Sequence, residues 1–285
     1  MSPTSDSAGP KAPDALPTAN TRAGSPRRVG VEVEFSGVTE ETVARRLAEC
    51  LGGTVSEDPA NHHWIVSDSA IGGFECYLDS RPLEKLDQDN LGRQLRDLAR
   101  SVVPVEIVSD PIKVSDIAQL DKALVDLRDA GATGTRAGIL LGFGVHFNPE
   151  AVSTELRDVL PVLTAYALIE DHLRRLADID MARRLLPWVD PYPRALVDAL
   201  AAETPPQSMA ALIDTYLDHA PSRNHGLDML CLFAEADRDR VARVMEMTQI
   251  SARPTYHLRL PDCRIDEADW SLAKEWSRWV LVEKV

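Results

Sequence analysis

The most constraining feature of this sequence is a short segment in which acidic and apolar residues alternate. Residues 28–35 read Arg-Val-Gly-Val-Glu-Val-Glu-Phe, so that every second residue from Val29 to Phe35 is apolar, while Glu32 and Glu34 stand between them. Successive side chains of a β-strand point to opposite faces of a sheet. The segment therefore predicts a strand with one apolar face and one acidic face.

The same design recurs further along the chain. We predict additional strands, on apolar alternation and β-branched or aromatic content, at residues 64–67, 74–78, 105–108, 139–148 and 255–260. Their polar positions carry Glu75, His146, Asn148, His257 and Arg259. If the strands form one antiparallel sheet, these groups line its open face.

Helical periodicity accounts for most of the remaining chain. We expect helices near residues 40–51, 88–101, 115–131 and 267–282, and a mostly helical region over about residues 151–250 that is interrupted by prolines. Residues 1–27 are rich in proline and small polar residues, which predicts a disordered tail. The expected fold is α+β: a single domain over residues 28–285, with an antiparallel sheet, helices packed on one face and a helical insertion.

Composition restricts the partners. The chain has 45 acidic and 31 basic residues and a formal net charge of −14, which disfavours nucleic acid and anionic membrane surfaces. Its four cysteines form no C-x-x-C pair, so neither a zinc knuckle nor a disulfide framework is indicated. No apolar run is long enough to span a membrane, and no secretory signal is evident. We expect a cytoplasmic protein.

The paired carboxylates of residues 28–35 suggest a cation site. Residues i and i+2 of a strand lie about 6.6–7 Å apart, so Glu32 and Glu34 would repel each other by roughly 2–3 kcal/mol at an effective dielectric near 20. A divalent cation would reverse that repulsion, and Glu75 could add a third oxygen ligand suited to Mg²⁺. The alternative is that the carboxylates simply belong to a solvated sheet face.

Four segments follow one another in a characteristic order: residues 28–35, Phe74-Glu-Cys-Tyr-Leu-Asp-Ser-Arg-Pro-Leu83, Gly144-Val-His-Phe-Asn148 and Thr255-Tyr-His-Leu-Arg259. Together they resemble the amidoligase family of the glutamine synthetase-like, carboxylate–amine ligase superfamily, over roughly residues 28–283. The resemblance implies a glutamine synthetase-like catalytic sheet that binds ATP through Mg²⁺. It also implies that a carboxylate is joined to an amine by way of an acyl phosphate.

The resemblance further implies roles for individual residues. Glu32, Glu34 and Glu75 look like metal ligands, and His146 looks like a metal or phosphate contact. Asn148 would orient the same site. Arg259 resembles the family arginine that neutralises the charge of the transferred phosphoryl group, a task suited to a guanidinium with forked donors.

Two positions depart from the family pattern, although we include both among the catalytic candidates. Arg81 stands before the proline of the second segment, where the family usually has serine. His257 stands where the last segment of the family commonly reads Glu-Phe-Arg, so a carboxylate is lost. A neutral imidazole could still coordinate a cation, but it binds Mg²⁺ less readily than a carboxylate does.

Two further arginines are candidates for binding the nucleotide. Arg253 lies just before the last predicted strand, where it could contact phosphate or be solvated. Arg223 lies in the run Ser-Arg-Asn-His-Gly-Leu-Asp, which resembles a family segment facing the active cleft but also suits a helix start. The adjacent His62 and His63 would face opposite sides of a strand, which argues against a metal site there.

The sequence thus predicts an ATP-dependent, Mg²⁺-requiring ligase that forms an amide or isopeptide bond between small-molecule or peptide carboxylate and amine substrates. A homo-oligomer is compatible with it. Two alternatives stay open: a non-catalytic relative that binds a nucleotide or ligand, motivated by His257, and a hydrolase that uses the same metals with water as the nucleophile.

Overall fold

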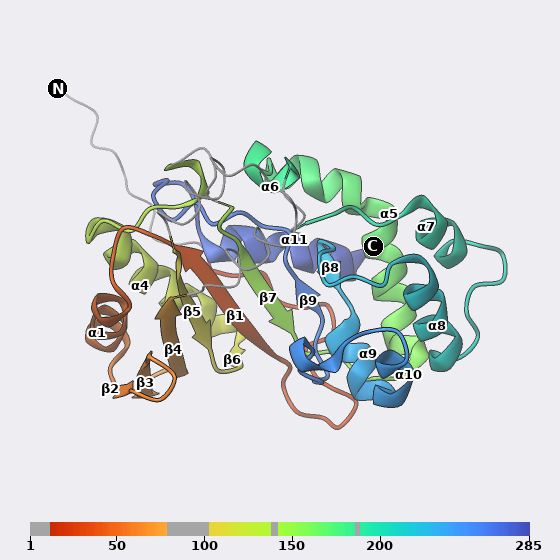
Figure 1. Ribbon diagram of the computed structural model, residues 1–285, viewed down its shortest axis with the longest axis horizontal. Coiled ribbons are helices and arrows are strands. Elements are labelled where there is room, and N and C mark those ends of the chain that lie inside the picture. Colours follow the sequence, from red (N-terminus) through yellow and green to blue (C-terminus); the bar gives the residue numbers. More distant parts are fainter. Residues whose placement is uncertain (1–11, 79–102, 138–141, 186–188) are drawn as a thin grey trace.

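The computed structural model describes residues 12–78, 103–137, 142–185 and 189–285. Within them, a single nine-stranded sheet runs in the order β2-β3-β4-β5-β1-β7-β9-β8, and β6 pairs with one end of β1 (Figure 1). Every strand pairing is antiparallel. The strands are β1 (Arg28–Phe35), β2 (Thr54–Asp58), β3 (His63–Ser69), β4 (Gly72–Leu78), β5 (Val105–Ser109), β6 (Ile112–Lys113), β7 (Val145–Pro149), β8 (Leu227–Asp228) and β9 (His257–Leu258).

The helices form two groups. Three of them, α1 (Glu40–Leu51), α4 (Ile117–Asp129) and α11 (Leu272–Lys284), pack together along one face of the sheet. The others come from one stretch of chain and mostly lie beyond the β8 end of the sheet in Figure 1. They are α5 (Leu156–Ala177), α6 (Met181–Leu185), α7 (Arg194–Leu200), α8 (Met209–His219), α9 (Leu230–Ala236) and α10 (Arg238–Ala242).

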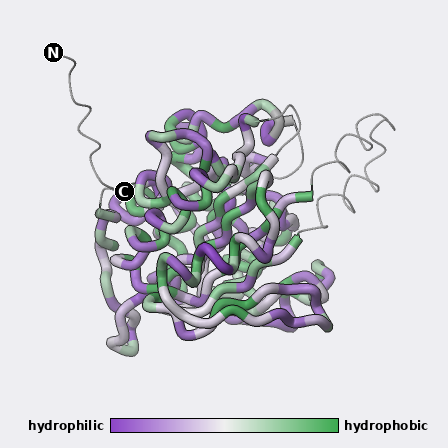
Figure 2. Tube along the Cα trace, turned by 90° about the vertical axis from the view of Figure 1, so that its left-hand side faces the viewer, coloured by the Kyte–Doolittle hydropathy of each residue, from purple (hydrophilic) through white to green (hydrophobic). Residues whose placement is uncertain are grey.

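The buried core lies between the sheet and the first group of helices and continues into the second group. The apolar residues of β1 are fully buried, as the alternation predicts, while its glycine and two glutamates are only partly buried. Phe147 of β7 meets Trp276 of α11 edge to face, with ring centroids 5.6 Å apart. In Figure 2 the hydrophobic stretches of the chain concentrate in the interior. This packing leaves the opposite, polar face of the central strands available for chemistry.

Several predicted elements are confirmed. The helix over residues 40–51 begins after Thr39, whose hydroxyl accepts a hydrogen bond from the Thr42 N–H. It ends at Gly52, whose positive φ of 76° suits glycine. The predicted strands at residues 64–67 and 74–78 form the hairpin β3–β4. The helix expected over residues 88–101 lies outside the described residues.

Other elements differ in extent from the predictions. β2 was not predicted, because its sequence Thr-Val-Ser-Glu-Asp is mostly polar; it is a largely exposed edge strand. Of the strand expected at residues 139–148, residues 139–141 lie outside the described residues, and β7 begins at Val145. β9 contains only two residues of the strand expected at 255–260. The region predicted as a helical insertion also contains β8, which returns the chain to the sheet.

The predicted disordered tail differs from the structure at residues 12–27. Leu16 is buried, and the main-chain oxygen of Asp14 accepts a hydrogen bond from Trp276 Nε1 at 2.8 Å. Arg27 is only 3% exposed and pairs with Glu283 at 2.6 Å. Composition alone indicated a solvated tail, because it does not show that α11 offers these residues a docking surface.

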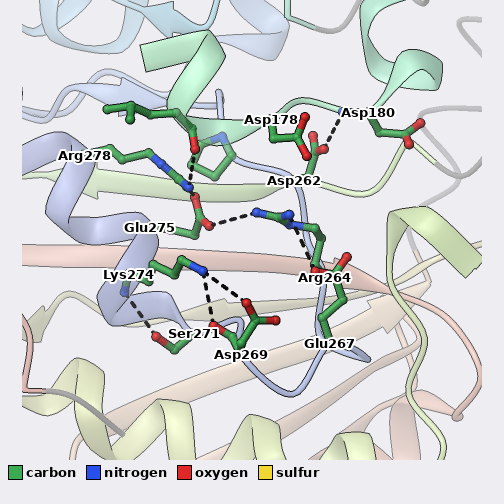
Figure 3. A network of polar contacts seen from close by, with 12 residues as sticks. Asp178, Asp180, Asp262, Arg264, Glu267, Asp269, Ser271, Lys274, Glu275 and Arg278 are labelled. Carbon is green, nitrogen blue, oxygen red and sulfur yellow. Dashed lines mark hydrogen bonds and ion pairs between the residues drawn. The ribbon is translucent and has the colours of Figure 1, made fainter. Parts of the chain in front are cut away.

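A network of charged side chains holds α11 against the loop that precedes it. Figure 3 shows Glu275 between Arg264 and Arg278, both of which form ion pairs with its carboxylate. Nearby, Asp262 accepts a hydrogen bond from the Asp180 N–H at 2.6 Å. Arg264, Glu275 and Arg278 are paired mainly with one another, which links α11 to the preceding loop. Among the described residues, no helix is long and apolar enough to cross a membrane.

Candidate functional site

The site is built on the polar face of β1 and its two neighbouring strands. Glu32 stands opposite His146 of β7 and Val108 of β5, while Glu34 stands opposite Glu106 of β5. Directly opposed residues in antiparallel strands have Cβ atoms about 4.5–5.5 Å apart. The register therefore brings three carboxylates and an imidazole within reach of one another.

Glu32 lies at the centre of this arrangement. One of its carboxylate oxygens accepts a hydrogen bond from His146 Nδ1 and the other from Asn148 Nδ2, both at 2.8 Å. The Oδ1 atom of Asn148 in turn accepts a hydrogen bond from Arg253 at 2.8 Å. Burial opposes ionisation of Glu32, but the proximity of His257 and the hydrogen bonds from His146 and Asn148 hold its pKa well below the usual value. Glu32 is therefore a fixed negative charge.

His257 approaches Glu32 from the next strand, β9. Its Nε2 atom lies 3.9 Å from Glu32 Oε2, and its Nδ1 atom lies 4.0 Å from Asp228 Oδ2. Both ring nitrogens are buried without a hydrogen-bond partner. Burial lowers the pKa of His257 well below its usual value, although Glu32 opposes the shift. The neutral ring can offer a lone pair to a cation.

Glu34 and Glu106 form an acidic pair beside Glu32 and His146. The N–H of Gly144 donates a hydrogen bond to Glu34 Oε2 at 2.8 Å, and Glu106 is buried. A side chain at Gly144 would have its Cβ only 3.1 Å from His146 Nε2 and 2.9 Å from Arg183, so the absence of a side chain keeps this corner open. A larger residue before β7 would therefore crowd His146 and Arg183.

Two sets of potential metal ligands result among the described residues. The donor atoms of each set lie within 4.8 Å of one another, and the sets share His146: they are Glu32–His146–His257 and Glu34–Glu106–His146. The second set, with two carboxylates, suits Mg²⁺, which prefers oxygen ligands. The first set, with two imidazoles and one carboxylate, suits Mg²⁺ less well.

Arginines gather on the β9 side of the site. Arg259 donates a hydrogen bond to the main-chain oxygen of Arg223 at 2.7 Å, and Arg223 Nε lies 3.6 Å from Asp228 Oδ2. The Nε atoms of both arginines are buried without a hydrogen-bond partner. Burial lowers the pKa of the Arg259 guanidinium, although Asp228 opposes the shift. These donors could bind the oxygens of an anion.

The loop after β9 is held by a residue of the helical region. Arg183 of α6 donates hydrogen bonds to the main-chain oxygens of Arg259, Leu260 and Pro261 and to the carboxylate of Asp262, at 2.6–3.0 Å. The helical region therefore helps to position Arg259. Nothing in the strand pattern of the sequence pointed to Arg183.

The structure brings together most of the predicted site residues but not all of them. Glu32, Glu34, His146, Asn148, Arg253, His257, Arg259 and Arg223 lie around the two ligand sets. Glu75 does not join them: β5 lies between β4 and β1, and Glu75 contacts His63 Nδ1 at 3.3 Å with 57% of its side chain exposed. Arg81 lies outside the described residues.

Glu106 was missed in the sequence, although a signal was present. It is the polar member of the strand Val-Glu-Ile-Val, between Val105 and Ile107, whose side chains are buried. The same alternation that singled out Glu32 and Glu34 places Glu106 on the polar face. Its pairing with Glu34 places its carboxylate close to those of β1, where the carboxylate of Glu75 was expected.

Comparison with known proteins adds a family relationship. Residues 25–281, nearly the whole chain, match the family model described as "Putative amidoligase enzyme". No curated protein and no solved structure matches the chain. The matched region contains both ligand sets and the arginines beside them.

Proposed function

Because the chain belongs to the amidoligase enzyme family, we propose that it is an ATP-dependent ligase that joins a carboxylate to an amine. The observation that carries this proposal is the meeting of Glu32, Glu34 and Glu106 with His146 on three adjacent strands. Such a concentration of negative charge can bind cations that accompany the phosphates of ATP. The substrates would be a small-molecule or peptide carboxylate and an amine.

The carboxylate pair Glu34–Glu106, with His146, would hold Mg²⁺. When bound, this ion would neutralise the oxygens of the ATP phosphates. The chain itself supplies the ligands in a fixed register, because both glutamates lie on paired strands and Gly144 holds Glu34 through its N–H. Little reorganisation is therefore needed when the nucleotide binds, and this preorganisation favours phosphoryl transfer.

The arginines would act on the phosphoryl group during transfer. In the first step, an oxygen of the substrate carboxylate attacks the γ-phosphorus of ATP, the bond to the β-phosphate oxygen breaks, and ADP leaves. Arg259 and Arg223 present guanidinium groups close to this site and would stabilise the negative charge on the transferred group. Arg253, which donates to Asn148, would add a contact at the rim.

In the second step, the amine lone pair attacks the carbonyl carbon of the acyl phosphate. The bond from this carbon to the phosphate oxygen breaks, inorganic phosphate leaves, and the amine loses a proton to give the amide. The chain contributes by holding the two substrates together near the cations. The atoms balance as ATP, carboxylate and amine giving ADP, phosphate and amide.

The test is ADP release that requires Mg²⁺, a carboxylate and an amine together, with hydroxylamine as a nucleophile that traps the acyl phosphate as a hydroxamate. Glu34→Gln should reduce the rate at least about a hundredfold, because it removes a cation ligand on which transition-state charge neutralisation depends. Glu57→Gln is the matched control, since Glu57 is exposed on the edge strand β2. A wild-type rate in Glu34→Gln would rule the mechanism out.

His257 favours a second candidate, a relative that binds the nucleotide without transferring its phosphate. It stands where the family pattern has a carboxylate, and its nitrogens have no hydrogen-bond partner. Calorimetry with ATP and Mg²⁺ separates the two functions. Tight nucleotide binding, with no ADP release across a broad panel of acids and amines, would support the binding protein instead of the ligase.

A further inference from the structure

His257 presents two polar atoms that the protein leaves unsatisfied. The residue is 4% exposed, and neither ring nitrogen has a hydrogen-bond partner. Leaving a buried donor or acceptor unpaired is destabilising, and buried polar groups in proteins are nearly always paired. Each ring nitrogen is therefore placed to take a partner, one on each side of the ring.

On the Nε2 side, the geometry fits a metal ion. Glu32 Oε2 lies 3.9 Å from His257 Nε2, and a donor atom of each of Glu32, His146 and His257 lies within 4.8 Å of the others. Bonds from a first-row metal to imidazole nitrogen or carboxylate oxygen are about 2.0–2.2 Å long. A single ion can therefore contact all three side chains with small adjustments.

On the Nδ1 side, Asp228 is placed to orient the ring. Asp228 stands directly opposite His257 in the pairing of β8 with β9, and its Oδ2 atom lies 4.0 Å from His257 Nδ1. The N–H of Leu230 fixes the other oxygen at 2.9 Å, while Oδ2 itself is buried without a hydrogen-bond partner. A carboxylate behind a metal-binding histidine is a common outer-shell arrangement, which fixes the ring and increases its basicity.

The donor set decides which ion this site prefers. Mg²⁺ favours oxygen ligands, whereas imidazole nitrogen suits transition metals, and two histidines with one carboxylate are typical of transition-metal sites. We infer that the Glu32–His146–His257 site binds a first-row transition-metal cation, in the range from Mn²⁺ to Zn²⁺, more selectively than a carboxylate-rich site would, and that Asp228 is the residue that orients His257. The inference refines the proposed function by assigning the two ligand sets to different ions.

The first experiment measures selectivity. Protein freed of metal by a chelator is titrated by calorimetry with Zn²⁺, Mn²⁺ and Mg²⁺, in wild type and in His257→Glu, which introduces a carboxylate at this position. We expect the ratio of Zn²⁺ to Mg²⁺ affinity to fall at least tenfold in His257→Glu. The matched control Glu75→Gln should keep the wild-type ratio. An unchanged ratio in His257→Glu overturns the inference.

The second experiment identifies the metal ligands directly. Pulsed electron paramagnetic resonance on the Mn²⁺-loaded protein should detect imidazole nitrogen couplings, and His257→Ala should lose those that arise from the second histidine. Asp228→Asn should keep these couplings but weaken Mn²⁺ binding by 10- to 100-fold, the range typical of lost outer-shell partners. Identical nitrogen couplings in wild type and His257→Ala, with both proteins folded by circular dichroism, would overturn the inference.

A parallel titration separates this inference from the proposed function. A non-hydrolysable ATP analogue is added with Mg²⁺ to the same proteins. If the analogue fails to bind while transition-metal selectivity is as expected, the ligase proposal fails and the metal assignment stands. If the analogue binds and the Zn²⁺ to Mg²⁺ ratio is insensitive to His257→Glu, the metal assignment fails alone.

Discussion

Two glutamate–histidine pairs on the same face of the sheet contain the same residue types but differ in their surroundings. Glu32 and His146 meet at 2.8 Å on central strands, with side chains 15% and 7% exposed. Glu75 and His63 meet at 3.3 Å on outer strands, with side chains 57% and 28% exposed. The same residue types are therefore largely buried in one pair and partly exposed to solvent in the other.

The difference comes from the neighbours that each pair has. Around Glu32, the strands β7 and β9 bring Asn148 and His257, and the chain before β9 brings Arg253. The carboxylate is therefore enclosed by polar and charged partners. Glu75 lies two strands closer to the β2 edge of the sheet, where water screens its interaction with His63. A carboxylate on the open face thus becomes a candidate ligand when adjacent strands supply further donors at short range.

The largest expected effect comes from Glu32→Gln. This change removes the charge that His146 and Asn148 surround, and we expect divalent cation binding and any ligase activity to fall at least about a hundredfold, more than is typical for loss of an outer-shell partner. Calorimetry and the ADP-release assay measure the two effects. A cation affinity close to that of wild type would show that the Glu32–His146 pair is no more a cation site than the Glu75–His63 pair.

Glu106→Gln tests whether the residue overlooked in the sequence belongs to the site. We expect at least a tenfold loss of Mg²⁺ affinity, because one carboxylate of the Glu34–Glu106 pair is gone. The metal-free protein should at the same time become more stable by up to about 1 kcal/mol, since like charges directly opposite each other on a sheet are destabilising. Thermal unfolding without Mg²⁺ measures the gain in stability, and thermal unfolding with Mg²⁺ measures the smaller stabilisation by the ion. Equal losses in both conditions would indicate a purely structural role.

The pH dependence of stability should also report the enclosed, ionised state of Glu32. The pKa of Glu32 lies well below 4.5 in the folded protein, so between the two values the folded state binds fewer protons than the unfolded state does. The stability that Glu32 contributes is therefore present above about pH 4.5 and is lost as the pH falls through the folded pKa. Denaturant unfolding between pH 7 and pH 3 should show a shallower loss in Glu32→Gln than in wild type. Equal slopes would contradict the enclosed, ionised state of Glu32.

The smallest expected effect comes from Glu75→Gln. A partly exposed ion pair is worth about 0.2–1 kcal/mol at most, so the change in unfolding free energy should stay below about 1 kcal/mol. Cation affinity and ligase activity should stay within about twofold of wild type, because Glu75 belongs to neither ligand set. A tenfold loss of cation affinity would show that Glu75 reaches the site after all.

The contrast also explains what the sequence could predict. Alternation identified β1, its acidic face and most of the polar groups that gather around it, because side-chain direction follows from local geometry. It could not give the strand order, which depends on long-range pairing. Glu75 was therefore grouped with Glu32 although β5 lies between their strands, and Glu106 on β5 was overlooked. Arg183 was not foreseen, because it reaches the site from a helix.

The most direct test of the central claim is anomalous diffraction from crystals grown with Mn²⁺ and a non-hydrolysable ATP analogue. The account predicts anomalous peaks beside Glu32, His146 and His257 and beside Glu34 and Glu106, with the phosphates of the analogue next to them. Peaks beside Glu75 and His63, with none at the inner strands, would contradict it.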